Sequence, residues 1–158
     1  MAGTRSDRLD RVTIDIVLAE GPLLEDWRTV HNATIPTHPL TADEVAERAT
    51  RHRLTLAYAT GELVGNATVR PPQEPEATAT VIVRILPEHR RQGHGSTYLE
   101  AELAQARDLG AHRIETVVLE SNADGLAFAH ARGFVEHDRY VLDGDVVAYV
   151  DLHLPREV

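Results

Sequence analysis

The sequence predicts an α/β (α+β) domain built on one central mixed sheet of about seven strands, with about four helices packed on it. Apolar residues alternate with period two in some segments and recur with helical spacing in others, in the order β-α-α-β-β-β-α-β-α-β-β. The chain of 158 residues is long enough for one sizeable core, and its only proline-rich break, at 70–77, is too short for a linker. We therefore expect a single domain over 11–158, preceded by a flexible tail at 1–10.

The first third of the chain contains a strand and two helices. Every second residue is apolar over 11–19, which is typical of a half-buried strand. From about residue 22 to 33 the apolar residues have helical spacing, which predicts a helix. A second helix is predicted over 41–50, because Thr41, followed three residues later by Glu44, forms a capping box.

The middle third contains a hairpin, a strand and the strongest helix. The hairpin spans 53–70 and is predicted to turn at Gly61-Glu62, and a more apolar strand follows over 77–86. The helix over 96–109 carries an apolar stripe, while its acidic residues, Glu102 among them, are predicted to face away from the core. The members of the stripe are Leu99, Leu103, Ala106 and Leu109.

The last third completes the sheet. A buried strand is predicted over 113–120, followed by a short helix over 122–132 that ends before Gly133. Residues 134–154 are interpreted as a hairpin with a two-residue turn at Asp143-Gly144, because Asp-Gly is typical of type I′ turns.

Composition and charge exclude several classes of function. The 25 Asp+Glu outnumber the 16 Lys+Arg, all of which are arginine, and the formal net charge is -9. This balance is opposite to the basic footprint of nucleic-acid-binding proteins, so we expect no nucleic-acid partner. The chain has no cysteine, which excludes disulfides, thiolate metal sites and a cysteine nucleophile.

The sequence shows neither a secretory signal nor a membrane span. The amino terminus is polar, and no run of about 18 apolar residues occurs, so we expect a cytoplasmic protein without a membrane partner. The 9 histidines lack the spacing of known metal motifs such as H-E-x-x-H, and we expect no metal.

Two glycines, Gly93 and Gly95, stand where the strongest helix begins, just after a strand. A helix amino terminus presents unpaired N–H groups and attracts anions, and glycine lets a ligand approach the backbone closely. A diphosphate is therefore the expected ligand. The dinucleotide pattern G-x-G-x-x-G fails because Tyr98 occupies the third glycine position, and the phosphate-loop pattern fails because no G-K-[ST] is present.

The remaining pattern, R-x-x-G-x-G from Arg90 to Gly95, resembles the coenzyme A signature of the GNAT superfamily of N-acyltransferases. The stretch "ESNADGLAFAHARGF" at 120–134 resembles that family's second signature, and the element order also matches. The resemblance covers almost the whole chain. It implies a central mixed, mostly antiparallel sheet, with acetyl-CoA as the cosubstrate.

The resemblance also implies which residues bind the cofactor. A bulged strand would leave backbone groups near Val83 and Ile85 free to pair with the pantetheine arm, and Asn122 would reach the cofactor from the next strand end. The slot for thioester and amine would open between strands 77–86 and 113–120. The pyrophosphate would bind the backbone and side chains of Arg90, Arg91, Gln92, Gly93, His94, Gly95, Ser96 and Thr97, with the His94 side chain exposed.

One position departs from the family pattern. The tyrosine that commonly protonates the leaving thiolate is replaced by Ala129, and the neighbouring Phe128 has no proton to give. Either Tyr140 or His130 is open as a substitute proton donor. Alternatively no acid is needed. The leaving group is a thiolate, and because an ordinary thiol has a pKa of about 8.5, this anion is stable enough to leave without being protonated.

The general base and the acceptor contacts are also open. The carboxylates nearest the expected slot are Glu76 and Glu120, and Glu76 is the preferred base. Two histidines, His31 and His38, bracket the loop between the first two helices, where the family commonly builds its acceptor pocket, and either is a candidate for substrate contact or for the base. Arg84 is a candidate for binding an acidic substrate group. An ordinary structural or solvent-exposed role is open for each of these residues.

Three functions are consistent with these patterns. The leading hypothesis is an N-acetyltransferase that moves an acetyl group from acetyl-CoA to a primary amine, on a small molecule or a peptide, by direct transfer in a ternary complex. The second is an acyl-CoA-binding or sensing module without turnover, motivated by Ala129. The third is an interaction protein that forms a homodimer through the edge of its final hairpin, "VAYVDLHL". The sequence does not name the acceptor.

Overall fold

A computed structural model describes residues 13–155, so the tail expected at 1–10 lies outside the described residues. Its element order matches the predicted one, with a short 3₁₀ helix added before α4. The elements are β1 (Asp15–Leu18), α2 (Leu23–Thr34), α3 (Ala42–Arg51), β2 (Arg53–Ala59), β3 (Glu62–Gln73), β4 (Thr78–Ile85), η1 (Pro87–His89), α4 (His94–Asp108), β5 (Arg113–Leu119), α5 (Ala123–Ala131), β6 (Val135–Tyr140) and β7 (Tyr149–Leu154).

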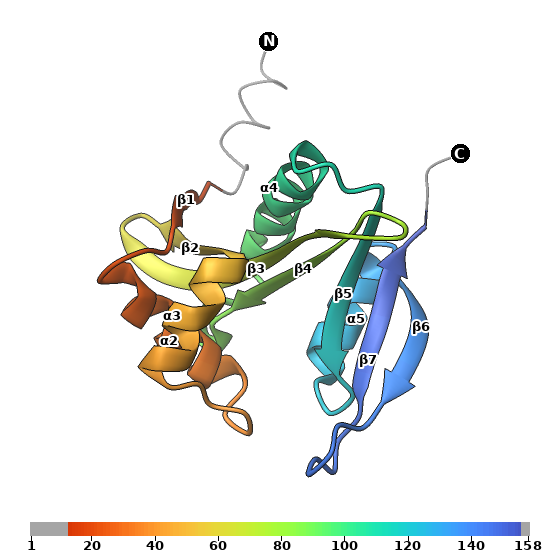
Figure 1. Ribbon diagram of the computed structural model, residues 1–158. Coiled ribbons are helices and arrows are strands. Elements are labelled where there is room, and N and C mark those ends of the chain that lie inside the picture. Colours follow the sequence, from red (N-terminus) through yellow and green to blue (C-terminus); the bar gives the residue numbers. More distant parts are fainter. Residues whose placement is uncertain (1–12, 156–158) are drawn as a thin grey trace.

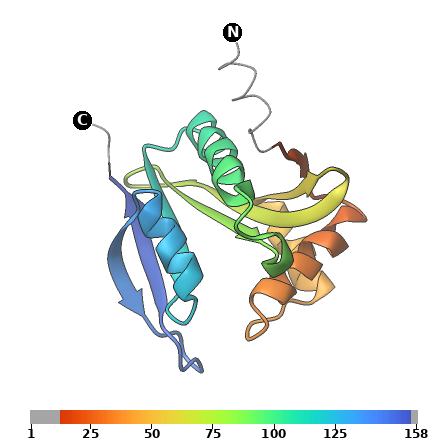
Figure 2. The same ribbon diagram turned by 180° about the vertical axis from the view of Figure 1, so that it is seen from behind.

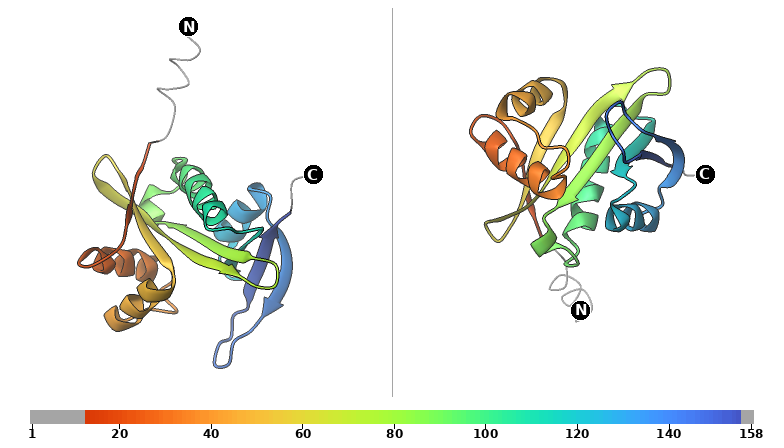
Figure 3. Two further views of the ribbon diagram at one scale, coloured as in Figure 1. Left: turned by 45° about the horizontal axis from the view of Figure 1, so that its top comes forward. Right: turned by 90° about the horizontal axis from the view of Figure 1, so that it is seen from below.

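The strands form one mixed sheet in the order β1-β2-β3-β4-β5-β7-β6, and every neighbouring pair is antiparallel except β4 and β5. The predicted fold class is therefore confirmed. α4 and α5 lie on one face of the sheet, as Figure 2 shows, and α2 and α3 lie on the other (Figures 1 and 3). α2 contacts β2, β3 and β4, and α5 contacts β5. The β5-β7-β6 half of the sheet thus carries a helix on one face only.

The two halves of the sheet diverge between β4 and β5. These strands pair only from Thr78 to Thr80 against Arg113 to Glu115, and beyond this point they separate (Figure 1). The bulge expected in β4 is absent, because its register with β3 is continuous from Thr80 to Ile85. The irregularity lies instead in β3, after Arg70, where two prolines interrupt the ladder.

Local signals near the amino terminus agree with the structure. The capping box of α3 is present: the Thr41 hydroxyl accepts the Glu44 N–H at 3.1 Å, and the Glu44 carboxylate accepts the Thr41 N–H at 2.9 Å. The first hairpin forms, but its turn residues are Thr60 and Gly61, one position earlier than predicted. Both have positive φ, at 49° and 80°, as a type I′ turn requires.

The final hairpin differs from the prediction in two ways. A turn forms at Asp143-Gly144, where the Asp145 N–H reaches the Leu142 carbonyl at 2.9 Å, but eight residues separate β6 from β7 rather than two. In addition, the segment "VAYVDLHL" forms β7, which lies inside the sheet between β5 and β6. Because both of its sides are paired, this segment is not an edge, and its choice as the dimer edge was wrong; the edge strand of the hairpin is β6, and the homodimer stays a prediction.

α4 buries a wider face than its apolar stripe predicts. Glu102, expected to face solvent, is 0% exposed, whereas Leu109 lies beyond the helix end and is 49% exposed. The Thr55 hydroxyl of β2 lies 2.6 Å from the Tyr98 hydroxyl and donates to Glu102 Oε1 at 3.0 Å, and Arg53 Nε lies 3.5 Å from Glu102 Oε2. Burial raises the pKa of Glu102 above its ordinary value of 4.5.

The buried Glu102 carboxyl should make the stability depend on pH. Unfolded Glu102 titrates near 4.5 and the folded residue titrates higher. As the pH rises through this interval, the folded state keeps a proton that the unfolded state has lost, and the free energy of unfolding falls. We expect Glu102→Gln to lose this dependence, so that its stability relative to the wild type increases from pH 4 to pH 7, as measured by denaturant unfolding.

The matched control is Glu100→Gln, which changes an exposed glutamate of the same helix. Its stability relative to the wild type should not increase over this range. Parallel pH profiles for the two variants would contradict the assignment.

Candidate active site

The amino terminus of α4 is shaped to expose its backbone. Gly93, the N-cap residue, has φ 84°, and Arg91 has φ 63°, so two residues of the loop are left-handed. The first bond within the helix runs from the Thr97 N–H to the Gly93 carbonyl at 3.4 Å. The amides of residues 94–96 therefore have no partner within the helix and point along its positive end.

Gly95 lies in a close contact that leaves little room for a side chain. A Cβ at this position would lie 3.2 Å from Cε1 of Phe128 on α5 and 3.7 Å from Cγ1 of Ile85 on β4. The first turn of α4 is thus packed between the end of β4 and α5, where the two halves of the sheet separate. This backbone cradle suits the anionic pyrophosphate of acetyl-CoA, because free N–H groups are the donors such a group needs.

The edge of β4 beyond Thr80 is not paired by β5. Leu86 donates its N–H to the Val64 carbonyl of β3 at 2.8 Å, and alternation along the strand directs the backbone groups of Val83 and Ile85 to the opposite edge. Val83 therefore presents a free N–H and carbonyl. The Ile85 carbonyl is not free, because Arg90 Nε donates to it at 3.0 Å.

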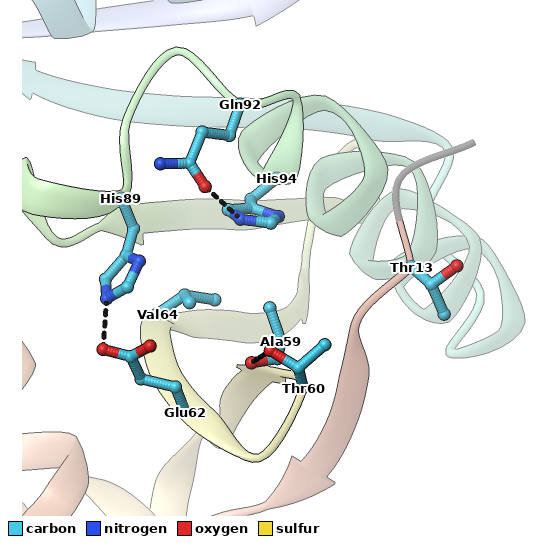
Figure 4. A pocket seen from close by; sticks show the side chains of 8 residues that line it. All are labelled: Thr13, Ala59, Thr60, Glu62, Val64, His89, Gln92 and His94. Atoms are coloured by element: carbon cyan, nitrogen blue, oxygen red, sulfur yellow. Dashed lines mark hydrogen bonds and ion pairs between the residues drawn. The ribbon is translucent and has the colours of Figure 1, made fainter. Parts of the chain in front are cut away.

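Side chains of the loop have structural partners. His94, expected to be exposed, is 8% exposed, and its Nε2 lies 3.2 Å from Gln92 Oε1. The Thr97 hydroxyl donates back to the Gly93 carbonyl at 3.3 Å, whereas Arg91 is exposed and Ser96 is partly exposed. The loop also borders a hollow of about 290 Å³, lined by Thr13, Ala59, Thr60, Glu62, Val64, His89, Gln92 and His94 (Figure 4).

Asn122 caps α5. Its Oδ1 accepts the Gly125 N–H at 2.9 Å, and its side-chain amide packs over Gly125, where a Cβ would lie 2.4 Å from Nδ2. The expected approach of Asn122 to the cofactor therefore competes with this capping role. Glu120, the other candidate for the base, pairs with Arg139 at 2.7 Å.

Two loops meet across the other face of the sheet. His38, between α2 and α3, places Nε2 3.1 Å from Oδ1 of Asp145, in the β6–β7 loop. Because a carboxylate only accepts, Nε2 carries a proton, so in the neutral ring Nδ1 is the nitrogen with the lone pair; Nδ1 lies 3.0 Å from the Thr37 hydroxyl. The His38 ring also contacts Tyr149 edge-on, with centroids 5.9 Å apart.

His31 and Arg84 lie deeper, against Trp27 of α2. The His31 ring stacks on Trp27 at 5.6 Å, and burial, with the nearby Arg84 charge, lowers its pKa to about 4. Arg84 lies over the same indole at 5.8 Å and donates to Asn66 Oδ1 at 3.4 Å. His31 is consequently a neutral imidazole near pH 7 and a weaker base than an ordinary histidine.

The other candidate acids and bases lie away from the opening or hold their protons. Glu76 is placed just before β4, at the end where β4 and β5 still pair, and accepts from Arg113 at 3.0 Å. Tyr140 donates to Asp151 at 3.0 Å, and burial raises its pKa to about 12. Such a phenol protonates a thiolate unfavourably, because an ordinary thiol has a pKa of about 8.5. Ala129 is buried in the core.

A sequence model of the Acetyltransferase (GNAT) family matches residues 22–134, which is more than half of the chain. The chain belongs to this acetyltransferase family. The family uses acetyl-CoA, and the unpaired amides of the backbone cradle at Gly93 and Gly95 are groups that could hold its pyrophosphate.

Solved structures share the fold. A protein assigned as a phosphinothricin N-acetyltransferase superimposes with a TM-score of 0.79 at 23% identity, covering 92% of this chain and 100% of that one. A protein assigned as an acetyltransferase from Salmonella typhimurium, solved with acetyl-CoA, gives 0.71 at 18% identity, covering 89% and 92%. The Escherichia coli ribosomal-protein-S18-alanine N-acetyltransferase gives 0.72 at 19%, covering 90% and 94%. A comparison with curated protein sequences finds no match.

Metal-binding groups and membrane-spanning helices are considered for the described residues only. Among residues 13–155 no group of three or more His, Cys, Asp or Glu side chains is arranged to hold a metal ion. In the same part of the GNAT acetyltransferase, none of the helices has the length and apolar character needed to span a bilayer.

Sequence reasoning missed the partners of the acceptor side. The sequence prediction places Asp145 at the start of the last strand, directly after the two-residue turn, whereas it lies in a loop and contacts His38 from 107 residues away. Asp151 and Tyr149 were considered only as strand residues. Their alternation in β7 was the available signal, because it places both on the face opposite the buried Val150 and Leu152.

The left-handed Gly93 allows a test of the cofactor cradle. We expect Gly93→Ala to weaken acetyl-CoA binding at least tenfold, because a Cβ at φ 84° costs about 1–2 kcal/mol and shifts the loop amides. Gly61→Ala is the matched control, since φ is 80° and no atom lies within 4 Å of its Cβ. Calorimetric titration should show unchanged affinity for the control, although its thermal stability falls comparably. Equal affinities of the two variants would contradict the cradle.

Proposed function

We propose that this protein is an N-acetyltransferase that moves the acetyl group of acetyl-CoA to a primary amine by direct transfer in a ternary complex. The observation that carries the proposal is the position of the α4 amino terminus, where Gly95 packs between Ile85 and Phe128 at the divergence of β4 and β5. Free amides and a free strand edge thus lie at one opening. Membership of the GNAT family supports the same reaction.

Two sets of backbone groups would bind two different parts of the cofactor. The amides of residues 94–96 would hold the pyrophosphate, and the free edge at Val83 would pair with the pantetheine arm. When bound, acetyl-CoA supplies an activated thioester carbonyl. A strand-edge N–H directed at that oxygen stabilises the negative charge that develops on it, and holding amine and acyl carbon together supplies much of the remaining acceleration.

His38 is the proposed general base. The attacking amine must lose a proton, and Nδ1 of His38 is the ring nitrogen that can accept it, directly or through the Thr37 hydroxyl. Asp145 is a positioning residue, because its contact with Nε2 fixes the tautomer and stabilises the imidazolium that forms. Without cysteine, the acyl group is not transferred through a thioester on the enzyme, so the amine attacks directly.

The first test is free-thiol release from acetyl-CoA by the purified protein against a mixed panel of primary amines, after titration with acetyl-CoA. Binding with release supports the proposal. Binding without release by any amine would instead favour the second candidate, a sensing module, for which the buried Ala129 in place of the usual tyrosine is the specific observation.

The base assignment predicts a selective loss of turnover. We expect His38→Gln to lower kcat by about 100-fold or more while the affinity for acetyl-CoA stays unchanged. Asp145→Asn should also lower kcat, because an asparagine amide can donate to Nε2 and so favour the tautomer that carries its proton on Nδ1. Thiol-release kinetics and titration of the same samples separate the two effects.

The control for this loss is His112→Gln, an exposed histidine before β5, which should leave kcat unchanged. A wild-type kcat in His38→Gln would remove His38 from the mechanism and leave the base to another group.

A further inference from the structure

Three arginines lie on the face of the sheet that α2 and α3 cover. Arg48 is in the last turn of α3, Arg70 is on β3, and Arg84 is on β4, over the Trp27 ring. The register of β3 with β4 places Arg70 and Arg84 on the same face. Among residues 13–155, no carboxylate oxygen lies within 4.0 Å of any of the three guanidinium groups.

Polar atoms without partners gather at the same place. Arg70 Nε, Arg84 Nε and Thr68 Oγ1 are buried and make no hydrogen bond in the described part of the chain, and the same is true of His52 Nδ1, at the end of α3. Buried polar groups are normally paired, so an aligned set of unpaired donors indicates a missing acceptor. Arg70 and His52 also line an open hollow of about 520 Å³ together with Arg51, Pro71 and Gln73, whereas Arg48 and Arg84 are not part of its lining.

The three guanidinium groups interact with one another. Burial, followed by the charges of Arg48 and Arg70, lowers the pKa of Arg84 to about 9, and no carboxylate counteracts this effect. The side chain is still a cation near pH 7. Like charges held together in a partly buried place destabilise one another, and a bound anion would relieve this repulsion.

The opposite wall of the opening carries the complementary charge. Tyr140, Tyr149 and Asp151 lie on the face of β6 and β7 that no helix covers, and the Arg70 and Arg48 charges oppose the rise in pKa of Tyr140 and Tyr149 respectively. The Asp151 carboxylate accepts from Tyr140 but has no cation within 4.0 Å among residues 13–155. Among the described residues, neither the three guanidinium groups nor the Asp151 carboxylate thus has an oppositely charged partner within 4.0 Å.

We infer that the acceptor is an amine that also carries an oxyanion, such as the carboxylate of an amino acid, bound by Arg48, Arg70 and Arg84 while its amino group lies toward Asp151. This inference rests on the proposed N-acetyltransferase function. Guanidinium groups present forked donors that match the two oxygens of a carboxylate, and they do so best where water is partly excluded. Polyamines and other purely cationic amines would be repelled by the same three charges.

The test compares free amino acids with their carboxamides as acceptors in thiol-release kinetics, at equal concentrations of unprotonated amine. We expect kcat/KM for the best amino acid to exceed that of its amide by about 100-fold, chiefly through KM. Arg70→Gln should lower kcat/KM for the acid about tenfold and change it less than twofold for the amide, with acetyl-CoA affinity unchanged. Arg84→Gln should act in the same direction and serves as the second variant.

Arg107→Gln is the matched control, because it removes the same charge from an exposed position on α4, on the other face of the sheet. The Arg107→Gln variant should keep the wild-type ratio of kcat/KM for the amino acid to kcat/KM for its amide. Equal turnover of acids and amides, unaffected by Arg70→Gln, would overturn the inference while the proposed function stands.

If acetyl-CoA does not bind, the proposed function fails, and direct calorimetric titration with the same acids and amides decides the anion site. Binding of the acid alone that is lost in Arg70→Gln supports the site, and equal or absent binding of both overturns it.

Discussion

The site depends on one interruption of hydrogen bonding, the separation of β4 from β5 after three residue pairs. A continued ladder would occupy the Val83 backbone and leave no opening. The first turn of α4 packs where the strands separate, with Gly95 beside Ile85 of β4 and Phe128 of α5. A Cβ at Gly95 would require the Phe128 ring to shift by a few tenths of an ångström. The small residue therefore allows the helix terminus to lie close to both halves of the sheet.

In the proposed function the same divergence would place the two substrates on different faces of the sheet. The α4 terminus and the β4 edge lie toward α4 and α5, whereas His38, Arg48, Arg70 and Arg84 lie toward α2 and α3. Because α5 covers only one face of β5-β7-β6, the other face is free to form a wall of the acceptor opening. The contact between His38 and Asp145 joins the loops from the two halves of the chain across that opening.

Much of the fold follows from local patterns. Period-two and helical spacing, the capping box at Thr41, and Asp-Gly or Gly signals predict the elements in the right order, because these signals act within a few residues. The errors arise where distant contacts override them. Glu102 is buried because Thr55 and Arg53 of β2 lie beneath it, and β7 is internal because β6 folds back to its outer side.

One part of the candidate site can be predicted from local sequence patterns, and the other part depends on distant contacts. The loop around Gly93 can be predicted from the sequence, because glycines at the start of a helix indicate an anion-binding backbone without any knowledge of distant contacts. The pairing of His38 with Asp145 and the grouping of Arg48, Arg70 and Arg84 come from five separate elements and loops, and no local pattern joins them. Arg84 alone was a sequence candidate for an acidic group, and its neighbours emerge only from the register of β3 with β4.

The cations beside the opening are all guanidinium groups, in a chain that contains no lysine. An amine side chain held next to an activated thioester is itself a nucleophile and would be acylated in time, with loss of its charge. A guanidinium remains protonated and unreactive under the same conditions. Arginine side chains can therefore bind an anionic acceptor in every catalytic cycle without being acetylated by the bound acetyl-CoA.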